Sequence, residues 1–240
     1  MREAVQHLGR RAAAEAIGTF FLVLIGTGAI VADGRSDGAV GIVGIALAFA
    51  FVILAMVYAI GHLSGAHINP AVTIAFWALG RFPAKDAATY VVAQCAGAVA
   101  ASLVLGALLA PATYGETVPS VGTSQAFVIE ALLSFALMFV VVAVATDERV
   151  TAGFAGLAVG LVVGFDVLFG AVLTGASMNP ARSLGPAVAG GTWTAHAIYW
   201  LGPIVGMVAA AWVYELLRPA AAPRLVSRRD ALGVAGPIDA

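Results

Sequence analysis

The stretch that decides the fold is residues 175–183, Gly175-Ala176-Ser177-Met178-Asn179-Pro180-Ala181-Arg182-Ser183. Residues 65–73, Gly-Ala-His-Ile-Asn-Pro-Ala-Val-Thr, repeat its pattern in the first half of the chain. In both copies an Asn directly precedes a Pro. Asn caps a helix well, because its side-chain oxygen accepts a free backbone N–H. Pro fits the first helical turn, where its missing N–H is not needed. Each copy therefore predicts a helix start.

The composition places the chain in a membrane. Of its 240 residues, 61% are hydrophobic and only 10% are charged, whereas a soluble domain carries about 25% charged residues. The net charge of −1 gives no support for a nucleic-acid partner. The single cysteine, Cys95, has no second thiol to pair with and no zinc-type neighbours, so it is interpreted as a packing residue.

Six apolar segments are long enough to span a bilayer, whose hydrocarbon core of about 30 Å needs about 20 helical residues. They are residues 12–32, 39–60, 87–109, 125–145, 152–173 and 196–217. Two shorter apolar segments, 70–79 and 180–189, follow the Asn-Pro pairs. At 1.5 Å per residue each reaches about 15 Å, half of the hydrocarbon thickness. The sequence therefore predicts six transmembrane helices and two half-helices.

The two halves of the chain, approximately 11–110 and 123–217, match beyond the paired stretches. Glu15 corresponds to Glu130, and Gly97 corresponds to Gly206. Because each half contains three full spans, the second half is inverted in the membrane relative to the first. The half-helices then enter from opposite faces and meet near the midplane. The predicted fold class is an all-α membrane protein built as an inverted repeat.

The basic residues predict the orientation. Of the 12 Lys and Arg residues, ten lie in loops and termini on the side that holds both chain ends. Arg35 lies on the other side, and Arg182 lies within the stretch 175–183. Positively charged loops stay in the cytoplasm. We therefore expect both termini, including a tail over residues 218–240, to be cytoplasmic, and the protein to lie in the cell membrane.

Opposed half-helices have a definite chemistry. Two helix N-termini at the midplane make a positive spot that repels cations, hydronium included. Asn69 and Asn179 can cap their helices through oxygen and offer N–H groups to an oxygen atom that passes in single file. A water molecule that accepts hydrogen bonds from both asparagines must orient its own hydrogens along the pore, so that no continuous chain of hydrogen bonds can conduct protons. Arg182 should line a wet cavity near the outer mouth, because a cation at the bilayer centre costs about 2.5–3.5 kcal/mol.

These features together resemble the aquaporin, or major intrinsic protein, family over roughly residues 11–217. The residues that carry the resemblance are Asn69, Pro70, Ala71, Asn179, Pro180 and Ala181, with Arg182, Glu15, Glu130 and Ser64-Gly65-Ala66-His67. The resemblance implies a right-handed bundle, one channel domain over residues 1–240, and a homotetramer with one pore per subunit. It also implies passive flux of water without a cofactor. Selectivity in such pores comes from pore width, lining donors and an Arg or half-helix dipoles.

The resemblance further implies a narrow filter made of Phe49, Val167, Ala176 and Arg182. Strict water channels usually have His where this chain has Val167, so the filter should be wider and more apolar. Residues 174–186 also resemble the nodulin-intrinsic branch, whose members are often linked to glycerol or metalloid hydroxides.

Two other features, Ser183 and the pair Tyr199-Trp200, instead resemble water-selective members. Two substrate ranges stay open. One is water with small uncharged solutes such as glycerol, hydrogen peroxide and metalloid hydroxides. The other is glycerol or metalloid hydroxides with little water.

Other polar residues in the spans have expected roles. Glu15 and Glu130 should accept N–H groups from the loops before the half-helices, whose backbone must be satisfied inside the protein. His67 should line the cytoplasmic part of the pore. His62 is either a pH-sensitive gate or a packing residue. Asp166, next to Val167, is expected to pair with a polar group at the mouth or to face a subunit contact.

Two rival classes fit the sequence less well. A secondary transporter also uses inverted repeats and broken helices. It would normally place carboxylates for coupling ions near the midplane, where this chain has Asn and Arg. An enzyme needs a nucleophile with a base, or metal ligands, and Ser177 and Ser183 have no His or Asp at a suggestive spacing. The sequence therefore favours a channel that is not an enzyme.

Overall fold

Eight α-helices, and no strand, make up the residues that the computed structural model describes, which are 2–147 and 153–218. The helices are α1 (Arg2–Arg35), α2 (Gly41–Ser64), α3 (Pro70–Ala78), α4 (Ala84–Leu109), α5 (Thr123–Thr146), α6 (Ala155–Thr174), α7 (Pro180–Gly190) and α8 (Ile198–Leu217). Six of them are long and apolar enough to cross a membrane. Helices α3 and α7 have only 9 and 11 residues. The all-α fold with six spans and two half-helices is confirmed.

The helix ends differ from the predicted ones by a few residues. Helix α1 runs well beyond the predicted 12–32 at both ends. Helix α4 begins at Ala84 and not at Ala87, because Pro83 provides the extended residue that precedes a helix. The predicted start of the fifth span at residue 152 and the tail after residue 218 lie outside the described residues. Four of the ten basic residues used for the orientation also lie there: Arg149, Arg224, Arg228 and Arg229.

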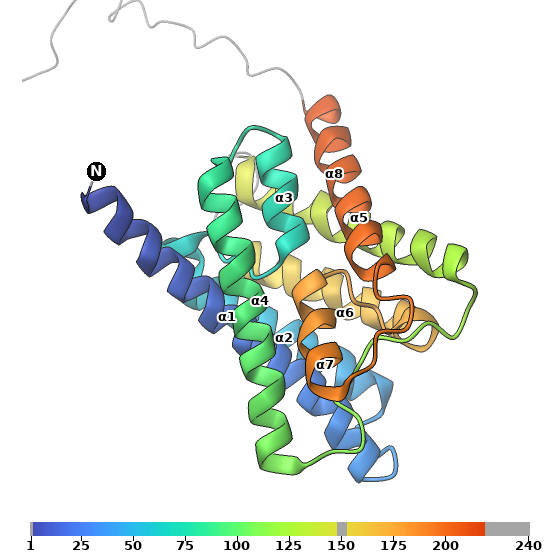
Figure 1. Ribbon diagram of the computed structural model, residues 1–240. Helices are drawn as coiled ribbons and strands as arrows, with labels where there is room; N and C mark the ends of the chain where they lie inside the picture. Colours follow the sequence, from blue (N-terminus) through green and yellow to red (C-terminus); the bar gives the residue numbers. More distant parts are fainter. Residues whose placement is uncertain (1, 148–152, 219–240) are drawn as a thin grey trace, which may run out of the picture.

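The helices pack as two matching sets. Helix α1 packs along α4, and α5 packs along α8 in the same way. The half-helices cross between the sets, since α3 packs on α8 and α7 packs on α4. Figure 1 shows α3 toward the end of the bundle that carries the chain's N-terminus, here called the N-terminal face, and α7 toward the opposite face. The arrangement fits half-helices that enter from opposite ends.

Close helix contacts in both sets depend on one glycine each. A Cβ added to Gly97 of α4 would lie 2.2 Å from the backbone oxygen of Ala16, and a Cβ added to Gly206 of α8 would lie 2.0 Å from that of Ala131. Ala16 and Ala131 directly follow Glu15 and Glu130. The two glycines therefore bring α4 and α8 against α1 and α5 beside the paired glutamates.

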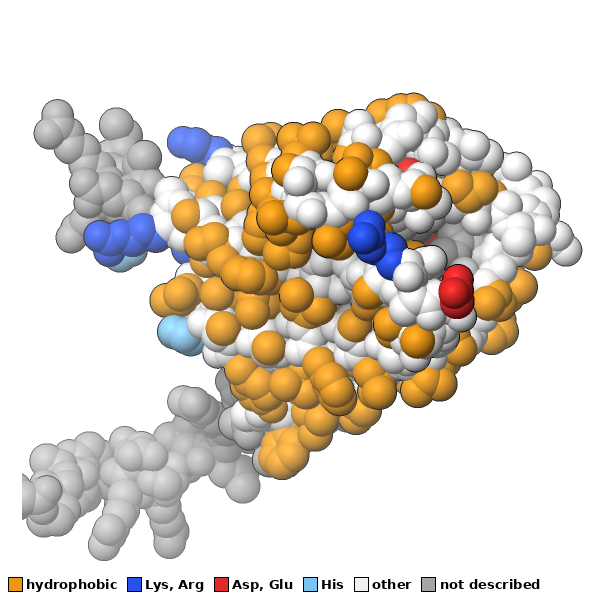
Figure 2. Space-filling view, turned by 90° about the horizontal axis from the view of Figure 1, so that it is seen from below, with side chains coloured by type: hydrophobic (Ala, Val, Ile, Leu, Met, Phe, Trp, Pro, Cys, Tyr) orange, Lys and Arg blue, Asp and Glu red, His pale blue; other side chains and the backbone are white. Residues whose placement is uncertain are grey.

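The outer surface of the bundle is apolar. Large hydrophobic side chains are strongly exposed on several spans, including Val92 at 70%, Leu108 at 72% and Phe169 at 60%. Figure 2 shows hydrophobic side chains over much of the surface seen from below and few charged ones. A soluble protein rarely exposes so large an apolar area. This surface is suited to contact with lipid.

The glycine contacts predict the effect of a single methyl group. Gly97→Ala should lower the unfolding midpoint in detergent, because overpacking costs about 1–3 kcal/mol and a backbone oxygen cannot rotate away. Gly9→Ala on α1, where a Cβ would meet nothing within 4 Å, is the matched control. Thermal unfolding followed by circular dichroism measures both. Equal midpoints for the two variants would contradict the predicted clash.

Candidate functional site

Both half-helices begin at their Asn-Pro pairs, as the sequence predicts. Asn69 precedes α3 in an extended conformation, and its side chain accepts a hydrogen bond from the backbone N–H of Ala71 at 2.8 Å. Asn179 precedes α7 and accepts the N–H of Ala181 at 3.0 Å and that of Arg182 at 3.4 Å. Pro70 and Pro180 occupy the first helical position. The side-chain oxygens thus satisfy N–H groups that a helix start leaves free.

Each Asn amide also reaches the other half of the chain. Asn69 Nδ2 donates to the carbonyl oxygen of Met178 at 2.8 Å. Asn179 Nδ2 donates to the carbonyl oxygen of Ile68 at 2.9 Å. An amide group has two N–H bonds, so one of each pair is used between the halves. The second remains for the cavity that both side chains line. The sequence analysis did not foresee these cross-links.

The loops before the half-helices, residues 65–68 and 175–178, are here called the motif loops. Their backbone is strained, since Ala66, Ile68, Ala176 and Met178 all have φ between +42° and +51°. For residues other than glycine this region costs of the order of 1–3 kcal/mol each. Such a backbone persists only where the surrounding structure holds it firmly.

Glu15 and Glu130 supply that support from α1 and α5. Glu15 accepts the backbone N–H groups of His67 at 2.9 Å and Ile68 at 2.6 Å. Glu130 accepts the corresponding groups of Ser177 at 3.0 Å and Met178 at 2.8 Å. The hydroxyls of Ser64 and Thr174 each donate to the same carboxylates at 2.6 Å. Each glutamate therefore ties one motif loop to the neighbouring span.

Two tyrosines complete this arrangement. Tyr90 donates to the carbonyl oxygen of Ser64 at 2.8 Å, and Tyr199 donates to that of Thr174 at 2.7 Å. Ser64 and Thr174 are the last residues of α2 and α6. Tyr199 is fully buried and is absent from the cavity lining. Its hydroxyl donates to the backbone, and its side chain does not line the cavity.

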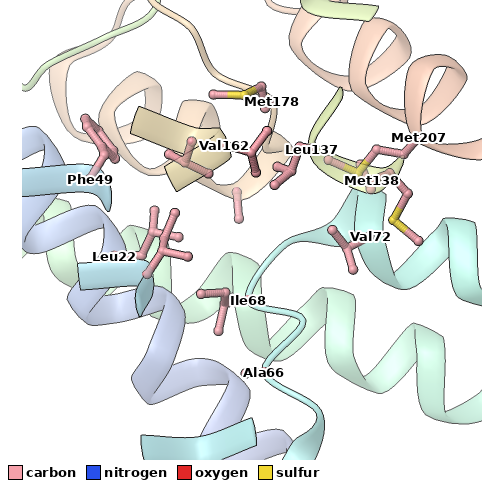
Figure 3. Packing of buried hydrophobic residues seen from close by; sticks show 14 of the residues in the cluster. Leu22, Phe49, Ala66, Ile68, Val72, Leu137, Met138, Val162, Met178 and Met207 are labelled. Atoms are coloured by element: carbon pink, nitrogen blue, oxygen red, sulfur yellow. The ribbon is translucent and has the colours of Figure 1, made fainter. Parts of the chain in front are cut away.

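A cavity of about 550 Å³ runs along the motif loops. Its lining on α2 extends from Phe49 to His62, which is about 20 Å of helix at 1.5 Å per residue. Most of the lining is apolar, and Figure 3 shows Leu22, Leu137 and Val72 among the side chains packed in this region. The polar lining includes Asn69, Asn179, Arg182 and His67.

All four residues expected to form the filter line this cavity and are buried: Phe49, Val167, Ala176 and Arg182. The guanidinium carbon of Arg182 lies 5.2 Å from the ring centroid of Phe49, a cation–π contact. Arg182 Nη1 also donates to the carbonyl oxygen of Gly115 at 2.7 Å. Sequence reasoning missed Gly115, because nothing in the connector 110–122 except its glycine and proline content marks it.

His67 lies where its ring is held on several sides. It stacks on Phe76 with centroids 5.0 Å apart and also contacts the rings of Phe82 and Tyr90. Its Nδ1 lies 3.1 Å from the hydroxyl of Thr73. His67 and His62 both line the cavity, on the part nearer the N-terminal face.

Two residues weighed in the sequence analysis lie outside the cavity lining. Ser183 forms hydrogen bonds with the hydroxyls of Thr117 at 2.8 Å and Ser177 at 2.6 Å. Asp166 is only 1% exposed, and its Oδ2 has no hydrogen-bond partner among the described residues. The expectation that Asp166 faces a subunit contact is therefore wrong, because a side chain this buried does not reach the surface of the bundle.

The carboxylate contacts predict that Glu130→Gln lowers stability. An amide in this place turns N–H groups toward at least one donor, and each buried donor left unpaired costs about 1–3 kcal/mol. Glu215→Gln is the control, since Glu215 makes partly exposed ion pairs with Arg81 and Arg218, and such pairs are worth about 0–1 kcal/mol. Unfolding midpoints in detergent measure both. A Glu130→Gln midpoint as high as that of the control would show that the carboxylate does not hold the loop.

Comparison with known proteins agrees with this architecture. Residues 3–214 match the family model of the major intrinsic proteins. Aquaporin NIP1-4 of Oryza sativa subsp. japonica is 48% identical over 207 residues, which cover 85% of this chain and 76% of that protein. Nodulin-26 of Glycine max is 45% identical over 207 residues, with the same two coverages.

A solved structure is similar as well. The X-ray structure of the aquaglyceroporin from Plasmodium falciparum superposes with a TM-score of 0.76 at 25% identity. The match covers 94% of this chain and 99% of that one. The chain therefore belongs to the major intrinsic protein family and is a multi-pass membrane channel, not an enzyme.

Proposed function

We propose that this chain conducts water and small uncharged solutes up to the size of glycerol, passively, and excludes protons and ions. The observation that carries the proposal is the composition of one end of the cavity. There Val167 and Ala176 present short apolar side chains, while Arg182 and Phe49 present a donor wall and an apolar wall. Selectivity in this kind of pore depends on diameter and lining donors.

The exclusion of cations is supported by the opposed half-helices. The hydrogen bonds of Asn69 and Asn179 to opposite loops hold the N-termini of α3 and α7 close to each other. Each N-terminus carries about half a positive charge. Arg182 adds a full charge toward one end of the cavity. A cation in the pathway thus meets positive potential in a region of low dielectric.

The wide solute range is supported by the positions of the residues that resemble water-selective channels and by the similar proteins. Ser183 and Tyr199, two of the three residues that resemble water-selective channels, do not themselves line the cavity. Their identity therefore does not set the width of the pathway. The similarity to NIP-type aquaporins, to nodulin-26 and to an aquaglyceroporin favours the same range.

The setting of the channel in the cell is also proposed. The N-terminal face carries most of the described basic residues, namely Arg10, Arg11, Arg81, Lys85 and Arg218, and Arg35 lies at the other end of α1. This asymmetry supports a cytoplasmic N-terminal face in the cell membrane. The whole chain forms one channel domain with two inverted repeats, and the family resemblance supports a homotetramer.

A flux comparison tests the solute range. In proteoliposomes the protein should pass both water and glycerol, followed by stopped-flow light scattering. Val167→His should reduce glycerol flux far more than water flux, because the larger ring narrows the opening and adds a polar edge. Val167→Ala, which removes bulk, should retain glycerol flux. A wild-type protein that passes water and excludes glycerol, hydrogen peroxide and metalloid hydroxides would refute the wide filter.

A charge substitution tests the cation barrier. Asn179→Asp replaces a donor that lies 2.9 Å from the Ile68 carbonyl by an anionic oxygen. This should weaken the positive barrier, raise potassium leak and lower stability, since two acceptors then face each other. Gln125→Glu, at the exposed start of α5, adds the same charge outside the cavity and should leave the leak unchanged. Identical leak in both variants, with both well folded, would argue against the barrier.

A further inference from the structure

The ring of Phe49 occupies a notch in α1 that exists because residue 26 is glycine. A Cβ added to Gly26 would lie 2.1 Å from Cε1 of the Phe49 ring and 2.5 Å from Cδ1 and Cζ. Ordinary van der Waals contacts of a Cβ begin near 3.4 Å. With any larger residue at position 26, the ring has to move by about an ångström or more, since well-packed interiors leave little free space.

The direction of that movement follows from the surroundings of the ring. Phe49 lies within α2, which packs along α1. Leu22, one turn before Gly26 on the same face of α1, lines the cavity, as Phe49 itself does. Arg182 lies over the ring with its guanidinium carbon 5.2 Å from the centroid. A ring displaced from α1 therefore moves into the space beside Arg182.

The second half of the chain shows the contrasting arrangement. The Glu15–Glu130 correspondence places Val141 of α5 at the position of Gly26, and the Asn69–Asn179 correspondence places Val159 of α6 at that of Phe49. Both valines line the cavity. The second half thus has two valines at these positions, whereas the first half has a phenylalanine and a glycine. The first half accommodates the larger residue only because its partner is glycine.

We propose that Gly26 is a specificity-determining position of this channel, because it lets the Phe49 ring lie in the wall and so keeps the opening beside Arg182 wide. This rests on the proposed function, in which Phe49 and Arg182 form part of the filter. Gly26 is absent from the cavity lining and acts through Phe49. It is therefore a positioning residue, and its effect should appear in the ratio of two fluxes.

The test compares four proteins with the wild type in proteoliposomes that contain equal amounts of folded channel. The variants are Gly26→Ala, Gly28→Ala, Phe49→Leu and the double variant Gly26→Ala/Phe49→Leu. Gly28→Ala is the matched control on α1, since a Cβ there would meet only Leu105 Cδ1 at 3.7 Å. Water and glycerol fluxes are measured by stopped-flow light scattering.

Gly26→Ala should lower the glycerol-to-water flux ratio by roughly fivefold or more, since selectivity follows pore diameter. Gly28→Ala should keep the wild-type ratio. The double variant should regain it, because leucine is shorter than phenylalanine and can turn away from the new methyl group. A wild-type ratio in Gly26→Ala, or a low ratio that the double variant does not regain, overturns the proposal.

The same set separates this inference from the proposed function. If the wild type excludes glycerol, the proposed solute range is wrong, and Gly26 is then judged on water flux. That flux should fall in Gly26→Ala relative to Gly28→Ala and return in the double variant, and its failure to do so overturns the inference. If Phe49→Leu alone changes neither flux, the filter assignment fails. If Gly26→Ala does not fold, the double variant should fold and show the wild-type ratio of glycerol to water flux. A double variant that also does not fold shows that the added methyl group does not clash with Phe49.

Discussion

The structure depends on two buried carboxylates that accept hydrogen bonds from non-helical backbone. In a membrane every backbone polar group needs a partner inside the protein. The motif loops break two helices in the middle of the bundle, so their N–H groups would otherwise face apolar surroundings. Glu15 and Glu130 accept two backbone N–H groups each. Those four bonds fix the loops from which α3 and α7 start.

The two halves of the chain hold each other in place. Each half-helix packs against a full span of the other half, α3 on α8 and α7 on α4. Each Asn amide donates across the same boundary. The inverted repeat is thus not two neighbouring bundles but one interlocked unit. The cavity lining includes both asparagines that make these bonds.

The sequence predicted those parts of the fold that depend on residues repeated in both halves. The Asn-Pro pairs predicted the half-helix starts, and the Glu15–Glu130 pair indicated where the loops would be held. Features present in one half only were missed. Gln94 donates to Glu15 at 2.8 Å, and the second half offers no matching donor, since the corresponding residue is Pro203.

Two further kinds of contact are hard to predict from a sequence. One is made by the backbone of a connector, and the other is possible only because a glycine leaves room for a neighbouring side chain. Gly115 binds Arg182 through a carbonyl oxygen that any residue carries. Gly26 resembles the many other glycines of the chain until the Phe49 ring is seen against it. Asp166 was expected either to pair with a polar group at the mouth or to face a subunit contact, and its burial is a matter of three-dimensional packing that no local pattern encodes.

The bonds between Asn69 and Met178 and between Asn179 and Ile68 also bear on how such a molecule could be regulated. Moving the two half-helix ends apart would break both buried bonds and leave their partners unpaired, at a cost of about 1–3 kcal/mol for each group. These two bonds therefore hold the half-helix ends at a fixed separation in the middle of the pathway. A change in the width of the pathway that leaves both bonds intact is therefore confined to the parts on either side of these asparagines.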